Sequence, residues 1–150
     1  MTYTLLWIED DPNDILLGER ALRKAGFPKP FVMRDGEEAI AYLSGKGQYD
    51  DRTRFPLPSL VLSDLKLPRV SGFDVLRWMR EQDGLRRIPM VMLTSSRQRS
   101  DIDAAYESGA NGYLVKPIET QQLIEVFHSL HAFWVVHNAG PEVQLKPANR

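Results

Sequence analysis

The chain has 150 residues, of which 43% are hydrophobic and 26% are charged, with a formal net charge of −1 and no cysteine. This composition is typical of one globular domain, gives no reason to expect nucleic-acid or acidic-membrane binding, and excludes disulfides, thiolate metal sites and cysteine nucleophiles. No apolar stretch is long enough to cross a bilayer and the N-terminus lacks signal-peptide features, so we expect a cytoplasmic protein.

Short apolar runs alternate with amphipathic stretches along the chain. We expect strands at residues 3–8, 30–33, 58–64, 88–94 and 111–116, and helices at residues 12–25, 36–44, 72–82, 99–108 and 119–136. Five repetitions of strand and helix predict an α/β fold in which helices cover both faces of a parallel sheet.

Local signals define the helix ends and the connections. Asp11 followed by Pro12 indicates a helix N-cap with proline at the first helical position. The polar segment 45–58 is expected to form a long surface loop, because it lies between two predicted elements. Residues 138–150 contain two prolines and few apolar side chains, so we expect one domain over residues 1–137 and a mobile C-terminal tail.

Polar side chains follow the predicted strands at the edge where ligands bind to open parallel sheets. They are Glu9, Asp10 and Asp11 after the first strand, Asp64 after the third, Thr94 after the fourth and Lys116 after the fifth. Carboxylates converging from two strands suit a Mg²⁺ ion, and an aspartate beside such an ion can attack phosphorus to form an aspartyl phosphate. A lysine and a threonine could then contact the phosphoryl oxygens.

Four segments at these strand ends carry a family resemblance: "LLWIEDDP", "LVLSDLKLPRVSGFDVL", "VMLTSS" and "GANGYLVKP". They resemble, in the same order, the motif regions of the receiver domain of two-component response regulators, over residues 3 to 130. The resemblance implies a flavodoxin-like, doubly wound, five-stranded parallel sheet of strand order 2-1-3-4-5 with five helices, the last one extended.

The resemblance also implies a metal-dependent phosphorylation site. Asp64 matches the phosphoacceptor, and Glu9 and Asp10 match the acidic pair that holds Mg²⁺, Asp10 directly and Glu9 through a water. The backbone carbonyl of Lys66 matches the third protein ligand. We hypothesise that the Lys66 side chain pairs with Glu9 or with the phosphate and so alters the lifetime of the phosphorylated form.

The remaining motif residues match parts of a conformational switch. Thr94 matches the switch hydroxyl, Tyr113 the switch aromatic, and Lys116 the lysine that pairs with the phosphoryl group. The bond between Lys116 and Pro117 is expected to be cis. Trp7 departs from the family pattern, which more often has a small aliphatic residue in this strand.

The long connection at 45–58 and the extended last helix are similar to those of single-domain response regulators that serve phytochrome-type light-sensing histidine kinases. The resemblance therefore implies a phosphorelay protein that accepts phosphate on Asp64 and is not an enzyme beyond self-phosphorylation and autodephosphorylation. Large aromatics at the end of the last helix, Phe133 and Trp134, predict a homodimer through the face formed by residues 99–108, 111–116 and 119–136. A tail folded over both aromatics is the alternative.

Two other functions use the same kinds of residues. A haloacid-dehalogenase-like phosphohydrolase also uses Mg²⁺ and an aspartyl phosphate, but it places its nucleophile after the first strand in an Asp-x-Asp pattern, where this chain has Glu9-Asp10-Asp11. A flavodoxin-like cofactor binder needs phosphate donors after the first strand, and three acids there would repel a phosphate. Both remain alternatives to the phosphoacceptor.

Overall fold

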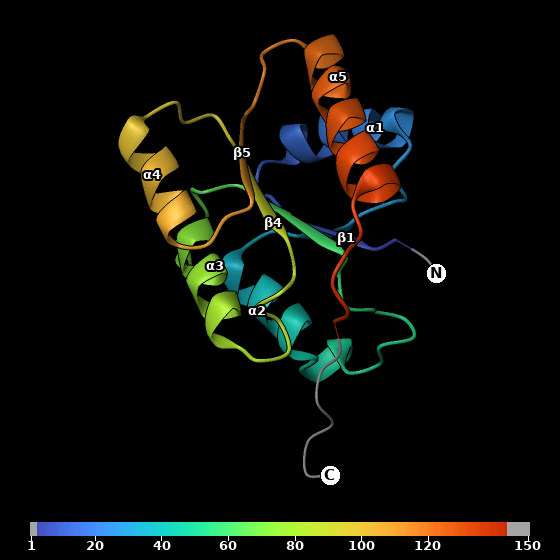
Figure 1. Ribbon diagram of the computed structural model, residues 1–150, viewed down its shortest axis with the longest axis vertical. Helices are drawn as coiled ribbons and strands as arrows, with labels where there is room; N and C mark the ends of the chain where they lie inside the picture. Colours follow the sequence, from blue (N-terminus) through green and yellow to red (C-terminus); the bar gives the residue numbers. More distant parts are fainter. Residues whose placement is uncertain (1–2, 144–150) are drawn as a thin grey trace.

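A five-stranded parallel sheet forms the centre of the protein (Figure 1). The computed structural model describes residues 3–143. The strands are β1 (Leu5–Ile8), β2 (Phe31–Met33), β3 (Leu60–Ser63), β4 (Met90–Thr94) and β5 (Gly112–Val115). Their order in the sheet is β2-β1-β3-β4-β5, which confirms the flavodoxin-like order 2-1-3-4-5.

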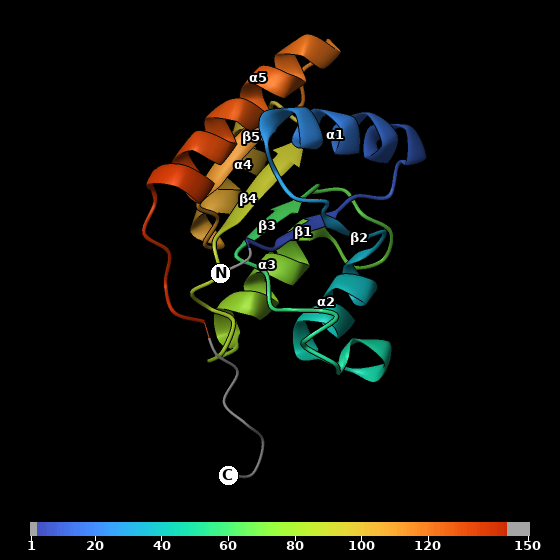
Figure 2. The ribbon, with the colours of Figure 1, turned by 90° about the vertical axis from the view of Figure 1, so that its right-hand side faces the viewer.

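Helices cover both faces of the sheet (Figure 2). The helices α1 (Pro12–Ala25) and α5 (Thr120–His131) lie on one face, and α2 (Gly36–Ser44) and α3 (Gly72–Glu81) lie on the other. The helix α4 (Arg99–Glu107) joins the second group, because its Ala105 packs into the same core cluster as α2 and α3. Within β1, Leu6 faces this cluster and Leu5 faces the core beneath α1 and α5. A buried parallel strand is therefore apolar at every position.

Helix ends follow the local sequence signals. The side chain of Asp11 accepts hydrogen bonds from the backbone N–H groups of Asn13 and Asp14, as an N-cap does, and Pro12 is the first residue of α1. The same helix ends at Gly26, whose φ of 102° lies in the left-handed region that glycine adopts without steric cost.

The connection between α2 and β3 is a well-anchored loop. It contains a short 3₁₀ turn, Gly47–Tyr49. Arg52 holds the loop to the end of α2 by donating hydrogen bonds to the carbonyl oxygens of Tyr42 and Leu43 at 2.8 and 2.9 Å. The predicted surface loop is thus tied to the body of the protein by backbone acceptors.

The last helix is extended, and its final part has the wider turn of a π-helix. Beyond His131 the chain continues as a π-helix over Ala132–His137. Residues 138–143 follow in irregular structure, and Val143 packs against the core. The predicted mobility of the tail stays a prediction, and residues 144–150 lie outside the described part of the chain. Within residues 3–143 no helix is long and apolar enough to cross a membrane.

Trp7 fits into β1 because of the residue that it faces on α1. The Trp7 side chain is 1% exposed. A Cβ atom added to Gly18 would lie 2.3 Å from Cη2 of the Trp7 ring, which is far inside van der Waals contact. The indole can therefore occupy this position only because residue 18 has no side chain.

This contact predicts a sign change in the effect of one substitution. Gly18→Ala should lower the free energy of unfolding by about 1–3 kcal/mol, because the methyl group overpacks against Trp7. In a Trp7→Val background the same substitution should raise it by about 0.5–1 kcal/mol, because alanine is the better helix former. Urea unfolding of the four proteins measures both effects, and the same sign in both backgrounds would contradict the contact.

Candidate functional site

Three carboxylates meet at the carboxyl edge of the sheet. Glu9 and Asp10 directly follow β1, and Asp64 directly follows β3. The two strands are hydrogen-bonded neighbours, and the backbone N–H of Asp64 donates to the carbonyl oxygen of Ile8 at 3.0 Å. One carboxylate oxygen of each acid lies within 4.8 Å of those of the other two. The strand register therefore forces these acids together.

Lys116 offsets this concentration of negative charge. It follows β5, and its backbone N–H donates to the carbonyl oxygen of Thr94 at 2.7 Å. Its ammonium donates to Glu9 Oε1, to Asp14 Oδ2 at 3.0 Å and to Asp64 Oδ2 at 3.0 Å. An ammonium has three N–H donors, so these contacts use all of them.

Burial and charge act in opposite directions on this cluster. Burial raises the pKa of Glu9, whose residue is 1% exposed, and the hydrogen bond and charge of Lys116 only partly offset that effect. Burial alone would lower the pKa of Lys116, but its hydrogen bonds with Glu9 and Asp14 and the charge of Asp64 outweigh burial and raise that pKa above its ordinary value. The lysine is therefore a permanent cation in the cluster.

The predicted switch residues are linked through Ser96. Thr94 is buried at the end of β4, and its Oγ1 accepts a 3.3 Å hydrogen bond from the backbone N–H of Ser96. Tyr113 on β5 is half-buried, and its hydroxyl donates to the Ser96 carbonyl oxygen at 3.0 Å. The Ser96 hydroxyl donates to Asp101 on α4 at 2.5 Å. The loop after β4 thus connects the site to α4.

One form of our hypothesis, that Lys66 pairs with Glu9, was wrong. Among the residues described, the lysine that contacts Glu9 is Lys116. Lys66 is exposed, and its backbone N–H donates to Asp64 Oδ1 at 3.3 Å. Lys66 follows β3, the neighbour of β1, so its strand end lies near Glu9, but its side chain is exposed, and it is Lys116 after β5 whose ammonium reaches Glu9. Pairing of Lys66 with a phosphate stays a prediction.

The prediction of a cis bond before Pro117 was also wrong. The described part of the chain contains no cis peptide bond. After Lys116 the chain leaves the sheet, and Ile118 is fully exposed. An X–Pro bond favours trans unless its surroundings impose the cis form.

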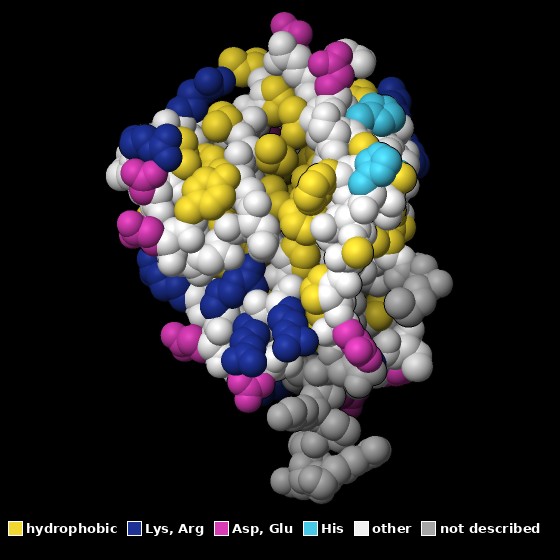
Figure 3. Space-filling view, in the orientation of Figure 1, with side chains coloured by type: hydrophobic (Ala, Val, Ile, Leu, Met, Phe, Trp, Pro, Cys, Tyr) yellow, Lys and Arg dark blue, Asp and Glu magenta, His cyan; other side chains and the backbone are white. Residues whose placement is uncertain are grey.

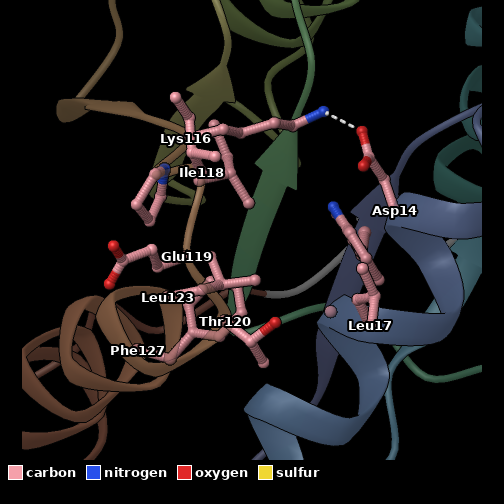
Figure 4. A pocket seen from close by; sticks show the side chains of 12 residues that line it. Asp14, Leu17, Lys116, Ile118, Glu119, Thr120, Leu123 and Phe127 are labelled. Carbon is pink, nitrogen blue, oxygen red and sulfur yellow. Dashed lines mark hydrogen bonds and ion pairs between the residues drawn. The ribbon is translucent and has the colours of Figure 1, made fainter.

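Asp14 is a site residue that the sequence reasoning missed. It lies in the first turn of α1 and contacts Lys116, although 102 positions separate the two in the chain (Figure 4). The signal was its spacing of three residues from Asp11, because the cap fixes which way the first turn of α1 faces. That signal carries meaning only once the first turn of α1 is known to lie within reach of Lys116.

A small cavity opens between α1 and α5 next to this contact (Figure 4). Its volume is about 100 Å³. Asp14 and Lys116 lie on its lining, with Leu17 of α1 and Leu123 and Phe127 of α5. The polar cluster therefore borders a largely apolar space on its α1 side.

The cluster has the donors of a divalent-cation site and of a phosphoryl acceptor. Glu9, Asp10 and Asp64 offer oxygen ligands, which hard divalent cations prefer. Asp64 has one oxygen on the Lys116 ammonium and the other within 3.3 Å of the Lys66 N–H. A carboxylate held between a cation and a backbone donor is oriented for attack on an electrophile.

Known proteins share this sequence and this fold. Residues 5–128 match the family model described as the response regulator receiver domain. The chain is 33% identical to response regulator Rcp1 of Synechocystis sp. over 132 residues, which are 87% of this chain and 88% of that protein.

Two solved structures extend the likeness to three dimensions. The phosphorylated cyanobacterial phytochrome response regulator RcpA is 32% identical, with a TM-score of 0.87 over 95% of this chain and 100% of that one. The Mn²⁺-bound form of response regulator Rcp1 is 32% identical, with a TM-score of 0.83 over 93% of this chain and 99% of that one.

The raised pKa of Glu9 predicts how cation binding depends on pH. Glu9 takes up a proton at a higher pH than an ordinary glutamate, and the protonated carboxyl is a poor cation ligand. The affinity for Mn²⁺ should therefore already decline as pH falls toward the ordinary glutamate pKa of about 4.3. Calorimetric titration between pH 8 and pH 5 measures this decline.

A Glu9→Gln variant is the control. It should bind Mn²⁺ more weakly at pH 8 and show a flatter pH profile, because the titrating group is gone. An equally steep profile in this variant would assign the pH dependence to another group.

Proposed function

This chain belongs to the response regulator receiver domain family, and on that premise we propose that it accepts a phosphoryl group on Asp64 from a histidine kinase. The observation that carries the proposal is the position of Asp64, between the acids Glu9 and Asp10 and the ammonium of Lys116. Its relatives include phytochrome response regulators, so we infer a kinase of the phytochrome type.

The transfer follows from the chemistry of the site. A carboxylate oxygen of Asp64 attacks the phosphorus of a phosphohistidine, an O–P bond forms and the P–N bond breaks, and the imidazole nitrogen keeps the electron pair. Glu9, Asp10 and Asp64, with the backbone carbonyl of Lys66, would hold Mg²⁺, which neutralises charge that develops on the phosphoryl oxygens. Lys116 holds the acceptor carboxylate and supplies a fixed positive charge.

Phosphorylation would be read out through the loop after β4. The phosphoryl group adds acceptor oxygens that Thr94 Oγ1 can contact, and this competes with the hydrogen bond from the Ser96 N–H. Tyr113 and Asp101 both bond to Ser96, so a shift of this loop reaches β5 and α4 together. The switch is a shift between two arrangements of α4, β5 and α5.

That face carries an apolar surface that suits a second copy of the chain. Hydrophobic side chains gather along β5 and α5 and on α4 (Figure 3). Phe133 is 54% exposed, and Tyr106 and Val136 are exposed as well. Trp134 is less exposed, because it stacks edge-on against Phe133 and packs partly into the core. We therefore propose a homodimer through this face, with Phe133 as the main contact and Trp134 as its support.

Replacing the acceptor tests the phosphorylation. Wild-type protein mixed with Mg²⁺ and acetyl phosphate should gain the mass of one phosphoryl group, and Asp64→Asn should gain none, because an amide cannot attack phosphorus. Asp83→Asn, which removes an exposed aspartate far along the chain, should behave like the wild type. Intact-protein mass spectrometry reads the result, and a phosphoryl group retained by Asp64→Asn would place the acceptor elsewhere.

Disrupting the apolar face tests the dimer. The wild type should sediment as a dimer at micromolar concentration, and Phe133→Asp should be monomeric, because a buried unpaired charge is costly at an interface. Leu16→Asp changes an equally exposed apolar residue on α1 and should leave the dimer intact. Sedimentation velocity with and without phosphorylation distinguishes these states, and a monomeric wild type in both would refute the proposal.

A further inference from the structure

The contact between Asp14 and Lys116 differs from the other two contacts of the lysine. The side chain of Asp14 is 43% exposed, whereas those of Glu9 and Asp64 are 1% and 14% exposed. Asp14 is also absent from the group of acids that could share a cation. It therefore binds the lysine from the solvent side, outside the set of metal ligands.

We propose that Asp14 is a positioning residue that competes with the phosphoryl group for Lys116 and so favours the unphosphorylated state. The inference rests on the proposed function, in which Lys116 pairs with a phosphoryl oxygen on Asp64. Through Asp14, the helix α1 would directly influence whether Asp64 carries a phosphoryl group. This influence is separate from the proposed switch, which runs from Thr94 through Ser96 to α4.

The competition follows from the count of donors on the lysine. The three N–H groups of Lys116 are all used by carboxylates in the resting structure. A phosphoryl oxygen can bond to the lysine only when one of these carboxylates lets go. Water replaces the most exposed partner at the lowest cost, because the other two would be left desolvated. That partner is Asp14.

Charge acts in the same direction. A phosphoryl group brings a charge of about −1.5 to −2 to the site. Asp14 lies within hydrogen-bond distance of the ammonium that this group must reach, so the two anions repel each other.

The surroundings give Asp14 room to move away. The cavity between α1 and α5 borders both Asp14 and Lys116, and in Figure 4 their contact lies on its margin. The backbone of Asp14 stays in place meanwhile, because its N–H is held by the Asp11 cap at 3.0 Å. The side chain can therefore release the lysine without unwinding α1.

Beryllofluoride, a non-covalent analogue of the phosphoryl group, tests this competition in the full chain. With Mg²⁺ present, Asp14→Asn should bind the analogue about threefold more tightly than the wild type, the size expected for loss of a partly exposed ion pair. Asp14→Glu keeps the charge and should restore the wild-type affinity. A purely structural role for Asp14 predicts the opposite sign, since a loosened Lys116 would bind the analogue less well.

A matched charge variant completes the experiment. Glu19→Gln removes one negative charge from the same helix, at a residue for which the structure shows no contact with Lys116, and should leave the affinity unchanged. Equal tightening in Glu19→Gln, or unchanged or weaker binding in Asp14→Asn, overturns the competition while the phosphoacceptor stands. If the wild type binds no analogue at all, the proposed function fails together with this inference.

Discussion

The central constraint on this protein is that its sheet brings several carboxylates to one place. Parallel strands end at the same edge, and the pairing of β1 with β3 puts Glu9, Asp10 and Asp64 side by side. Burial raises the pKa of Glu9, and the nearby charge of Asp64 adds to that effect. The fold accommodates the cluster because β5 delivers Lys116 to the same edge, where its ammonium contacts two of these acids.

The same side chains have two roles. Lys116 neutralises Glu9 and Asp64 in the resting cluster, and these residues are also the ones that would contact a bound cation or phosphoryl group. A cation or a phosphoryl group entering the site changes which charges Lys116 must neutralise. The same strand ends carry Thr94 and Tyr113, which meet at Ser96 and so link the site to α4. These hydrogen bonds are the route by which the proposed phosphorylation would act on the surface where Tyr106 and Phe133 are exposed.

The helix α1 contributes two contacts, one of Asp14 with Lys116 and one of Gly18 with Trp7. Its start is fixed by the Asp11 cap, which aims Asp14 at the lysine, and one turn later Gly18 leaves space for the indole of Trp7. A haloacid-dehalogenase-like phosphohydrolase is disfavoured by the same geometry, because the isolated aspartate follows β3 and the residues after β1 are a paired acidic set.

Local sequence patterns predicted the strands and helices, and the residues at the strand ends included most of those that meet at the site. Apolar runs, helix caps and turn residues act over a few positions, so the strands and the helix bounds near Pro12 and Gly72 could be predicted from local patterns. The strand order and the roles expected of Asp64 and Lys116 came instead from the resemblance to the receiver family. The pairing of charges, by contrast, could be read only from the folded chain. The choice of Lys116 rather than Lys66 for Glu9, the contact of Asp14, the trans bond before Pro117 and the fit of Trp7 onto Gly18 depend on distances between segments that are remote in sequence. Local patterns carry no such distances, because the packing of whole helices against the sheet sets them.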